Sequence, residues 1–356
     1  MSTTLQTTTR SYAAHEHPLW RRLLLTREWA VIALLAVVVL YSLANVRNFD
    51  GPLTLTFLLL DTATILLIAL PMTLVIVTGE IDLSVASIVG LSSVLLGVLH
   101  EAGLSIPVAG ALAILAGVAC GAFNGFLVAY VGLPSLAVTI GTLALFRGLA
   151  VGLLGTKAIT DFPDSWKDLA TATIGDTGIP VVMILFVVLA LVFTLLLQFT
   201  TFGRGIYDIG LNSEAAHFTG VNVERTKFIL FVLSGAVSAL AGVYYTLRFG
   251  SARGDNAVGL ELQVIAAVLL GGVSIFGGRG KLHGVIAGVL LIGVISSALR
   301  LESVQVSYTN VIIGLLLVAS VMSPSVLAWV SGKTARRNKR GSGPQSAPVG
   351  VGTQGR

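Results

Sequence analysis

Long runs of apolar residues make up most of the chain, and short polar segments separate them. A helix needs about 20 apolar residues to cross the hydrocarbon core of a membrane. The pattern therefore predicts an all-α membrane protein, a polytopic bundle of about ten transmembrane helices. The predicted spans are 29–46, 53–78, 84–100, 106–131, 134–155, 179–199, 227–248, 261–276, 281–299 and 307–330.

Two of these spans, 84–100 and 261–276, are short and rich in glycine. They are candidates for broken or partly re-entrant helices, which lipid tolerates only where other protein covers the backbone. The first span, 29–46, follows a polar lead with arginines, a pattern that also occurs in cleaved signal peptides. Because the lead is long and Ser42-Leu43-Ala44 is a poor cleavage site, we interpret it as an uncleaved span.

Three regions follow from this division of the chain. Residues 1–28 form an N-terminal cytoplasmic segment and residues 29–330 the transmembrane domain. Residues 331–356 are basic at first and then rich in Gly, Ser and Pro. We expect this tail to be disordered and its basic part to contact anionic membrane lipid.

The distribution of lysine and arginine predicts the orientation, because these residues concentrate in cytoplasmic segments. With the N-terminus inside, fifteen of them fall in cytoplasmic segments and six in outer segments, while Arg147 lies within a span. An even number of spans then places both termini in the cytoplasm. Glu80 and Asp82 on a predicted inner turn do not change this result, since acidic residues weigh little in the rule.

Composition agrees with a membrane environment. The chain is 55% hydrophobic and 11% charged, with a mean hydropathy of +0.92, whereas soluble domains carry about 25% charged residues. The net charge of +5 is spread over short flanks and loops, which argues against a nucleic-acid partner. The single cysteine, Cys120, lies in an apolar run. It excludes an internal disulfide framework and favours a packing role.

Small residues recur at regular intervals. Gly117, Gly121 and Gly125 are four residues apart in one span, as are Gly284 and Gly288 in another, which favours close helix packing. A weak internal similarity also suggests two inverted halves, with spans 2–5 related to spans 7–10, a common plan in transporters. The matching tetrapeptides are 115–118 with 286–289 and 138–141 with 311–314.

Signatures of catalysis and metal binding are missing from the sequence. It contains no complete P-loop, H-E-x-x-H, nucleophile elbow or G-x-G-x-x-G pattern. Its five histidines lie at ends or in loops, without metal-ligand spacing inside a span. We therefore predict no catalytic residue, no metal site and no cofactor on this chain, so that any ATP drive requires a partner.

The loop at 200–226, on the predicted cytoplasmic side, encodes a short capped helix. Asn212 or Ser213 is a good N-cap, and Glu214 in the first turn suits the helix dipole. Ala215 and Ala216 are small and helix-forming, and Gly220 is able to end the helix in the left-handed conformation. The segment is either an ordinary amphipathic connector or a docking element for a partner.

Four segments of the chain form a recognisable set. They are 201–222, Gly79-Glu80-Ile81-Asp82-Leu83-Ser84-Val85, Thr142-Leu143-Ala144-Leu145-Phe146-Arg147-Gly148 and 270–280. Together they resemble the ribose/xylose-type permeases of ABC importers, in the branched-chain amino acid and sugar permease superfamily, and the resemblance covers roughly residues 28–330. Departures from the family pattern include Glu80 for the usual Gly, Asp208 and Leu211 for small residues, and His217-Phe218 for Arg-Leu.

The resemblance implies a role and a set of partners. It implies a permease subunit for a sugar in a bacterial cytoplasmic membrane, paired with a second permease as a homo- or heterodimer. Two ATPase subunits that use ATP and Mg, and an extracytoplasmic solute-binding protein, complete such a system. Pentoses, deoxyhexoses such as rhamnose and the furanosyl signal autoinducer-2 all fall within the family. The implied ATPase-coupling helix comprises Asn212, Ser213, Glu214, Ala215, Ala216 and Gly220.

Polar residues within or beside the spans are candidates for the substrate path, and each has a structural alternative. Asp82 and Ser84 either cap the third span or line a gate, and amides within spans either bond another helix or bind sugar. Equal depth suggests an ion pair between Asp61 and Arg147, the alternative being an arginine that snorkels outward. The candidates are Asp61, Asp82, Ser84, Asn124, Arg147 and Asn310.

An ion-coupled secondary transporter of a small polar solute is the rival class. Such a transporter is expected to carry several acidic residues deep inside its spans, and only Asp61 meets this condition. It would also leave the capped helix of the central loop without a role. The sequence therefore favours the ABC permease.

Overall fold

A computed structural model of the chain describes residues 27–305, 307–316 and 318. Within them, seven helices are long and apolar enough to cross a membrane, and three shorter apolar helices accompany them. Each of the ten predicted spans holds one, so the all-α polytopic bundle is confirmed. The long helices are α2 (Arg27–Asn45), α3 (Thr54–Val77), α5 (Ile106–Gly125, extended by π-helical Phe126–Tyr130), α6 (Ser135–Leu154), α8 (Val182–Phe199), α11 (Val223–Phe249) and α13 (Leu282–Leu301); the short ones are α4 (Val85–Glu101), α12 (Leu260–Leu270) and Ser307–Leu316.

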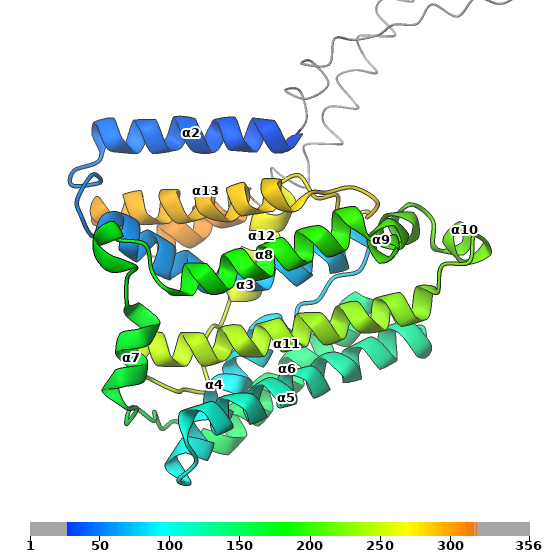
Figure 1. Ribbon diagram of the computed structural model, residues 1–356, viewed down its shortest axis with the longest axis horizontal. Coiled ribbons are helices and arrows are strands. Elements are labelled where there is room, and N and C mark those ends of the chain that lie inside the picture. Colours follow the sequence, from blue (N-terminus) through cyan, green and yellow to red (C-terminus); the bar gives the residue numbers. More distant parts are fainter. Residues whose placement is uncertain (1–26, 306, 317, 319–356) are drawn as a thin grey trace, which may run out of the picture.

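The bundle has two ends, because its long helices lie side by side (Figure 1). The helices α9 (Thr201–Leu211) and α10 (Ser213–Phe218) lie at one end, which we call the α10 end. The helix α7 (Asp164–Thr171) lies at the opposite α7 end, followed by a 3-10 turn at Gly175–Thr177.

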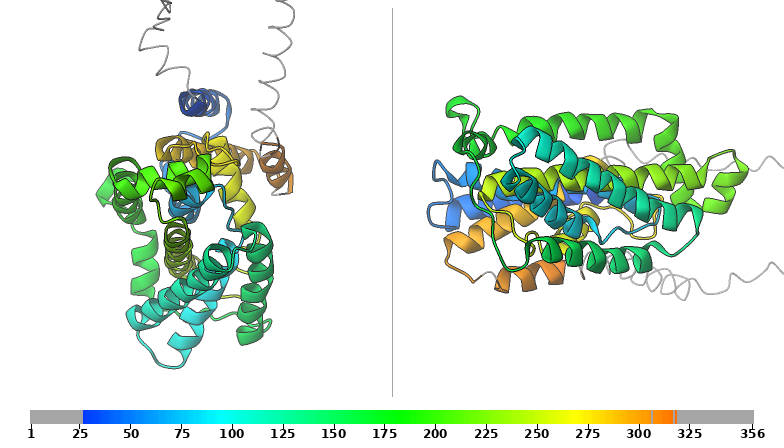
Figure 2. Two further views of the ribbon diagram at one scale, coloured as in Figure 1. Left: turned by 90° about the vertical axis from the view of Figure 1, so that its right-hand side faces the viewer. Right: turned by 90° about the horizontal axis from the view of Figure 1, so that it is seen from below.

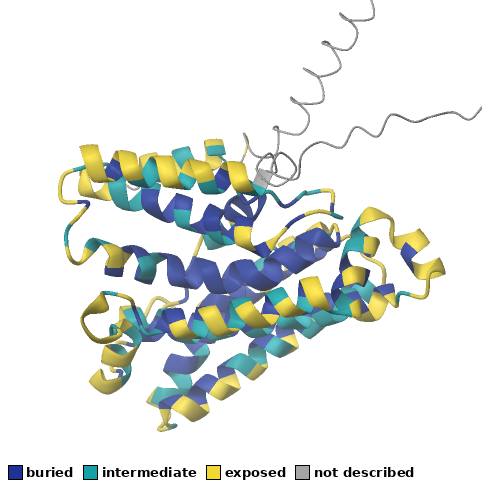
Figure 3. Cartoon of the chain, turned by 45° about the horizontal axis from the view of Figure 1, so that its top comes forward, coloured by how far each residue is buried: buried dark blue, intermediate teal, exposed yellow. Residues whose placement is uncertain are grey.

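The helix α3 forms the centre of the bundle. It packs against α8, α11, α12 and α13, and its residues 66–78 are buried without a break. A helix that is apolar all round is expected in such a place. The periphery is apolar too. The helix α2 lies on the outer side of α13 (Figure 2), and many of its residues are exposed (Figure 3). These exposed residues include large apolar ones such as Leu40 and Tyr41. An apolar rim around an apolar centre suits a lipid environment.

Glycine spacing brings α5 and α11 together, as the four-residue repeat predicted. A Cβ on Gly117 would overlap Ala239, and one on Gly121 would overlap the Phe231 carbonyl oxygen. On α13, Gly288 faces the Ala267 carbonyl oxygen in the same way. These contacts confirm close helix packing.

Irregular chain adjoins two of the short helices, α4 and α12. Residues 78–84 lead into α4, and the Ile81 amide and carbonyl bond the hydroxyls of Ser135 and Thr139 on α6. Residues 271–281 follow α12, and the Gly278 amide donates to the Val77 carbonyl at 2.8 Å. The freed backbone groups thus find partners inside the protein, as a bilayer requires.

The order of elements agrees with the proposed internal repeat. A long helix, a short helix and two further helices follow one another in α3–α6 and again from α11 to Ser307–Leu316. The inverted relation of the halves nevertheless stays a prediction. The predicted segments 1–28 and 331–356 lie outside the described residues, except that Arg27 and Glu28 begin α2.

Candidate functional site

The capped helix predicted in the central loop is present as α10. The Asn212 side chain accepts a hydrogen bond from the Ala215 amide at 2.9 Å, and Glu214 stands in the first turn. Gly220 follows the helix with φ +90°. Ala216 is buried against the rest of the bundle, whereas Phe218 is 81% exposed. The helix therefore presents an apolar side chain outward at the end of the bundle.

The preceding helix α9 was missed by the sequence analysis. Thr200 caps it by accepting from the Gly203 amide at 3.0 Å. Its glycines disfavour a helix by propensity, but two of them permit close contacts. A Cβ on Gly203 would overlap the Leu197 carbonyl oxygen, and one on Gly210 would overlap that of Val77.

Contacts beside α9 connect the α10 end with the irregular segments. Tyr207 on α9 donates its hydroxyl to the Gly280 carbonyl at 2.7 Å, and burial raises the pKa of this phenol. Glu80, which departs from the family pattern, pairs with Lys227 near the start of α11 at 2.5 Å. Tyr207 therefore joins α9 to residues 271–281, and Lys227 joins the start of α11 to residues 78–84.

A buried polar cluster surrounds Asp82, Ser84 and Asn124. One Asp82 oxygen accepts from the Ser84 amide at 3.0 Å and hydroxyl at 2.6 Å, and the other accepts from Ser234 at 2.7 Å. Asn124 donates to the Ser84 hydroxyl at 2.8 Å. All four side chains are fully buried. This bond joins α5 to the start of α4, in agreement with the helix–helix interpretation of Asn124, while the buried Asn124 Oδ1 has no partner among the described residues.

Arg147 and Asp61 do not form the predicted ion pair. Arg147 donates to the carbonyl oxygens of Ala86, Gly254 and Asn256 at 3.0, 2.8 and 2.6 Å. Two of these carbonyls belong to irregular backbone after α11 and the third to the first turn of α4, so Arg147 is bonded inside the protein instead of snorkelling outward. The helix α6 that carries Arg147 packs mainly against α4, while α3 has other neighbours. Depth alone does not identify a partner.

Asp61 instead joins three helices near the α7 end. One of its oxygens pairs with Arg248 of α11, and the other pairs with Arg300 of α13 at 2.5 Å. Arg248 is almost buried and also donates to the Leu60 carbonyl at 2.5 Å, whereas the Arg300 side chain is 62% exposed. The alternative of capping by Thr64 is not seen, since its buried hydroxyl has no partner.

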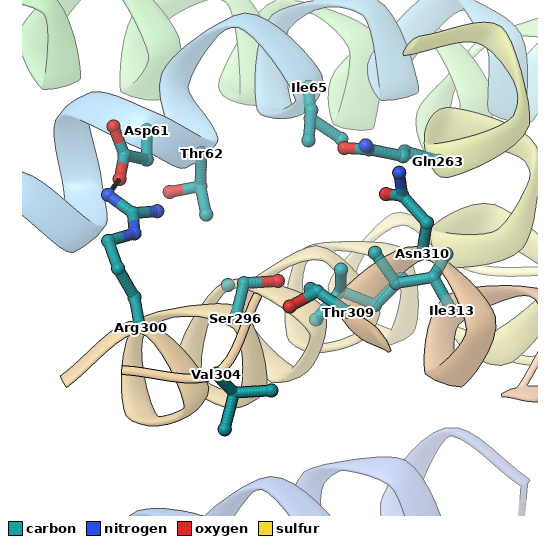
Figure 4. Close-up of a pocket in the computed structure, with 12 residues that line it drawn as sticks. Asp61, Thr62, Ile65, Gln263, Ser296, Arg300, Val304, Thr309, Asn310 and Ile313 are labelled. Atoms are coloured by element: carbon teal, nitrogen blue, oxygen red, sulfur yellow. Dashed lines mark hydrogen bonds and ion pairs between the residues drawn. The ribbon is translucent and has the colours of Figure 1, made fainter. Parts of the chain in front are cut away.

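A pocket of about 190 Å³ opens beside this ion cluster. It lies between α3, α12, α13 and the helix Ser307–Leu316, and it brings together two predicted candidates, Asp61 and Asn310. Figure 4 shows Asp61 and Arg300 at one end, and the amides of Gln263 and Asn310 together at the other. The lining is Asp61, Thr62, Ile65, Gln263, Ile292, Gly293, Ser296, Arg300, Val304, Thr309, Asn310 and Ile313.

Several side chains of the pocket, of the ion cluster at Asp61 and of the Asp82 cluster are not among the residues predicted from the sequence. Arg248 and Arg300 lie at predicted outer ends, where they were counted as loop residues. For the two arginines the sequence does hold a signal, because side chains on a helix lean toward its N-terminus. Arginines at the C-terminal ends of α11 and α13 therefore reach back to the level of Asp61. Gln263 and Ser234 gave no comparable signal.

Comparison with known proteins bears on the whole chain. The model of the family described as branched-chain amino acid transport system / permease component matches residues 54–321. The chain is 37% identical to the autoinducer 2 import system permease protein LsrD of Yersinia enterocolitica over 306 residues, 84% of this chain and 92% of that protein. It is 36% identical to the LsrD protein of Klebsiella pneumoniae over 312 residues, covering 86% and 93%.

No solved structure matches the chain. The family match nevertheless spans more than half of the sequence, and both relatives are covered almost completely. The chain is therefore a membrane transport subunit that belongs to the family of branched-chain amino acid transport system permease components.

Proposed function

We propose that this chain is the permease subunit of an ATP-driven importer that moves a sugar-like solute across the bacterial cytoplasmic membrane. The relatives named as autoinducer 2 import permeases support a solute of this class. Pentoses and deoxyhexoses stay within the proposal. Both termini, and the α10 end with them, face the cytoplasm, in agreement with the distribution of lysine and arginine.

The proposed assembly supplies what this chain lacks. Two ATPase subunits bind ATP and Mg at the cytoplasmic face, a solute-binding protein delivers the solute at the α7 end, and a second permease completes the pathway. The second permease is either another copy or a related chain. This permease itself holds no cofactor in the proposal.

The exposed α10 carries the proposal. Phe218 at 81% exposure and Leu211 at 67% are apolar side chains on short elements outside the long helices. Because they lie outside the long helices that lipid surrounds, we infer that a partner protein covers them. An ATPase that covers Phe218 and Leu211 removes their apolar surface from water. Movement of α10 then passes directly into α11, which begins five residues after α10 ends.

The predicted substrate-path residues divide into two groups in the proposal. Asp61 and Asn310 line the pocket and face the solute. Asp82, Ser84, Asn124 and Arg147 shape the path rather than touch the solute, because each is hydrogen-bonded to other parts of the chain.

Reconstitution tests this function. The purified chain alone is expected to hydrolyse no ATP, whereas the complete complex in proteoliposomes is expected to take up labelled autoinducer 2 or a pentose only with ATP and the binding protein. Uptake without ATP that collapses with an ionophore would instead support the ion-coupled transporter.

A further inference from the structure

The pocket beside Asp61 has the chemistry of a binding site for hydroxyl groups. Its walls carry a carboxylate, two amides, a guanidinium and the hydroxyls of Thr62, Ser296 and Thr309 (Figure 4). Carboxylates accept hydrogen bonds, while amides and hydroxyls both donate and accept. Such a mixture suits a ligand whose groups are themselves donors and acceptors.

The remaining walls are apolar. Ile65, Ile292 and Ile313 lie among the polar groups of the lining. Ligand sites usually combine an apolar surface with a few polar groups that fix orientation. Since a site for one water needs only about 10–15 Å³ of such space, a pocket of about 190 Å³ has room for more than a single bridging water.

The two arginines on Asp61 differ in a way that matters for binding. Arg248 is 9% exposed and is held by a second bond to the Leu60 carbonyl, so it is the more firmly positioned of the two partners of Asp61. Arg300 is 62% exposed, and exposed ion pairs contribute little stability. A hydroxyl donor is therefore able to replace Arg300 on its Asp61 oxygen at small cost.

We propose that this pocket is a solute site for a small, uncharged, polyhydroxylated molecule of monosaccharide size. In this site Asp61 accepts from a solute hydroxyl, Gln263 and Asn310 bond the far side, and Arg300 is the exchangeable partner that the solute displaces. Arg248 is a positioning residue that holds Asp61. The inference rests on the proposed transport function and assigns the binding side chains within it.

Apolar variants of similar volume test the site in the complete complex. With saturating solute-loaded binding protein, Gln263→Leu and Asn310→Leu are expected to lower the uptake of labelled autoinducer 2 and ribose at least tenfold. The matched control is Gln198→Leu, at an exposed position of α8 outside the pocket, which should leave uptake unchanged.

The two arginines give a second comparison. Arg300→Gln should keep at least half of the uptake, because its bond is exchangeable, whereas Arg248→Gln should lose most of it. Equal losses in both variants would overturn the assignment of Arg300.

Direct binding is measured by protection of a thiol. In a Cys120→Ser background, solute should slow the labelling of Asn310→Cys by a water-soluble maleimide at least fivefold and leave Gln198→Cys unaffected. No protection, together with normal uptake in the leucine variants, would overturn the site while leaving the transport function intact. A wild-type complex without ATP-dependent uptake of any probe, combined with protection, would reject the transport function and keep the binding site.

Discussion

At the scale of single residues, lateral neighbours decide what a charged group inside the bundle does. The sequence places Arg147 and Asp61 at equal depth and opposite charge, which is why their pairing was predicted. In the structure Arg147 serves three backbone carbonyls, while Asp61 belongs to Arg248 and Arg300. A sequence gives the depth of a residue along a helix, but the angle between helices comes from packing across the whole bundle.

Arg147 is therefore expected to matter for stability rather than for charge balance. Hydrogen bonds to a charged donor contribute about 1.5–3 kcal/mol each, and Arg147→Met removes three. We expect a clear fall in the thermal midpoint of the purified chain, with a smaller fall for Arg147→Lys and none for exposed Arg204→Met. The double swap of Arg147→Asp with Asp61→Arg should do no better than the worse single variant. Recovery of stability in the double variant would instead support the predicted ion pair between Arg147 and Asp61.

The cluster at Asp82 makes a second prediction at this scale. Asp82→Ala leaves the hydroxyls of Ser84 and Ser234 without their acceptor, at about 1–3 kcal/mol for each unsatisfied buried group. Asp82→Asn keeps one acceptor oxygen and should lose less. Thermal unfolding in detergent measures both, and solute preference is measured in parallel. Altered preference at normal protein level would assign Asp82 to the substrate gate instead of a structural role.

At the scale of elements, α10 allows a sharp test of coupling. Gly220→Val forces a branched side chain into φ +90°, and Glu214→Arg reverses the charge in the first turn. Both should lower co-purification of the ATPase severalfold and leave its basal hydrolysis without uptake. Gly103→Val is the matched control, since Gly103 has φ +97°, no neighbouring atom within 4 Å and a place at the α7 end. Normal uptake in both α10 variants would remove the coupling role.

Helices were predictable here wherever one local signal decides them. Apolar length located a helix in each of the ten predicted spans, seven of them long enough to cross a membrane, and the cap at Asn212 with Gly220 located α10. The missed α9 shows the limit, because its glycines weaken a local helix signal and are explained only by the distant carbonyls against which Gly203 and Gly210 pack. Only some residues of the pocket were likewise predictable from the sequence. Asp61 and Asn310 stand out as polar residues inside spans, whereas the roles of Gln263 and Arg300 depend on how α12 and α13 meet α3.

At the scale of the whole molecule, ion pairs hold α11 at both of its ends. Lys227 near its start pairs with Glu80, and Arg248 near its end pairs with Asp61. Between these points α11 packs against α3, α4 and α5. A displacement of α10 therefore has a continuous path through α11 to the carboxylate that lines the pocket. This path can couple a cytoplasmic ATPase to solute movement only if the two ends of the bundle face opposite sides of the membrane.

The orientation is the prediction that tests this condition. Lysine and arginine counts place the α10 end in the cytoplasm and the α7 end outside. The only native cysteine, Cys120, is buried, so Cys120→Ser provides a thiol-free background. Single cysteines at exposed Asp176, beside α7, and exposed Thr219, after α10, then report on the two sides. In intact cells a membrane-impermeant maleimide should label Asp176→Cys, and it should reach Thr219→Cys only after permeabilisation. The reverse pattern would place α10 outside the cell, where no ATPase operates. It would therefore reject α10 as the docking site of a cytoplasmic ATPase.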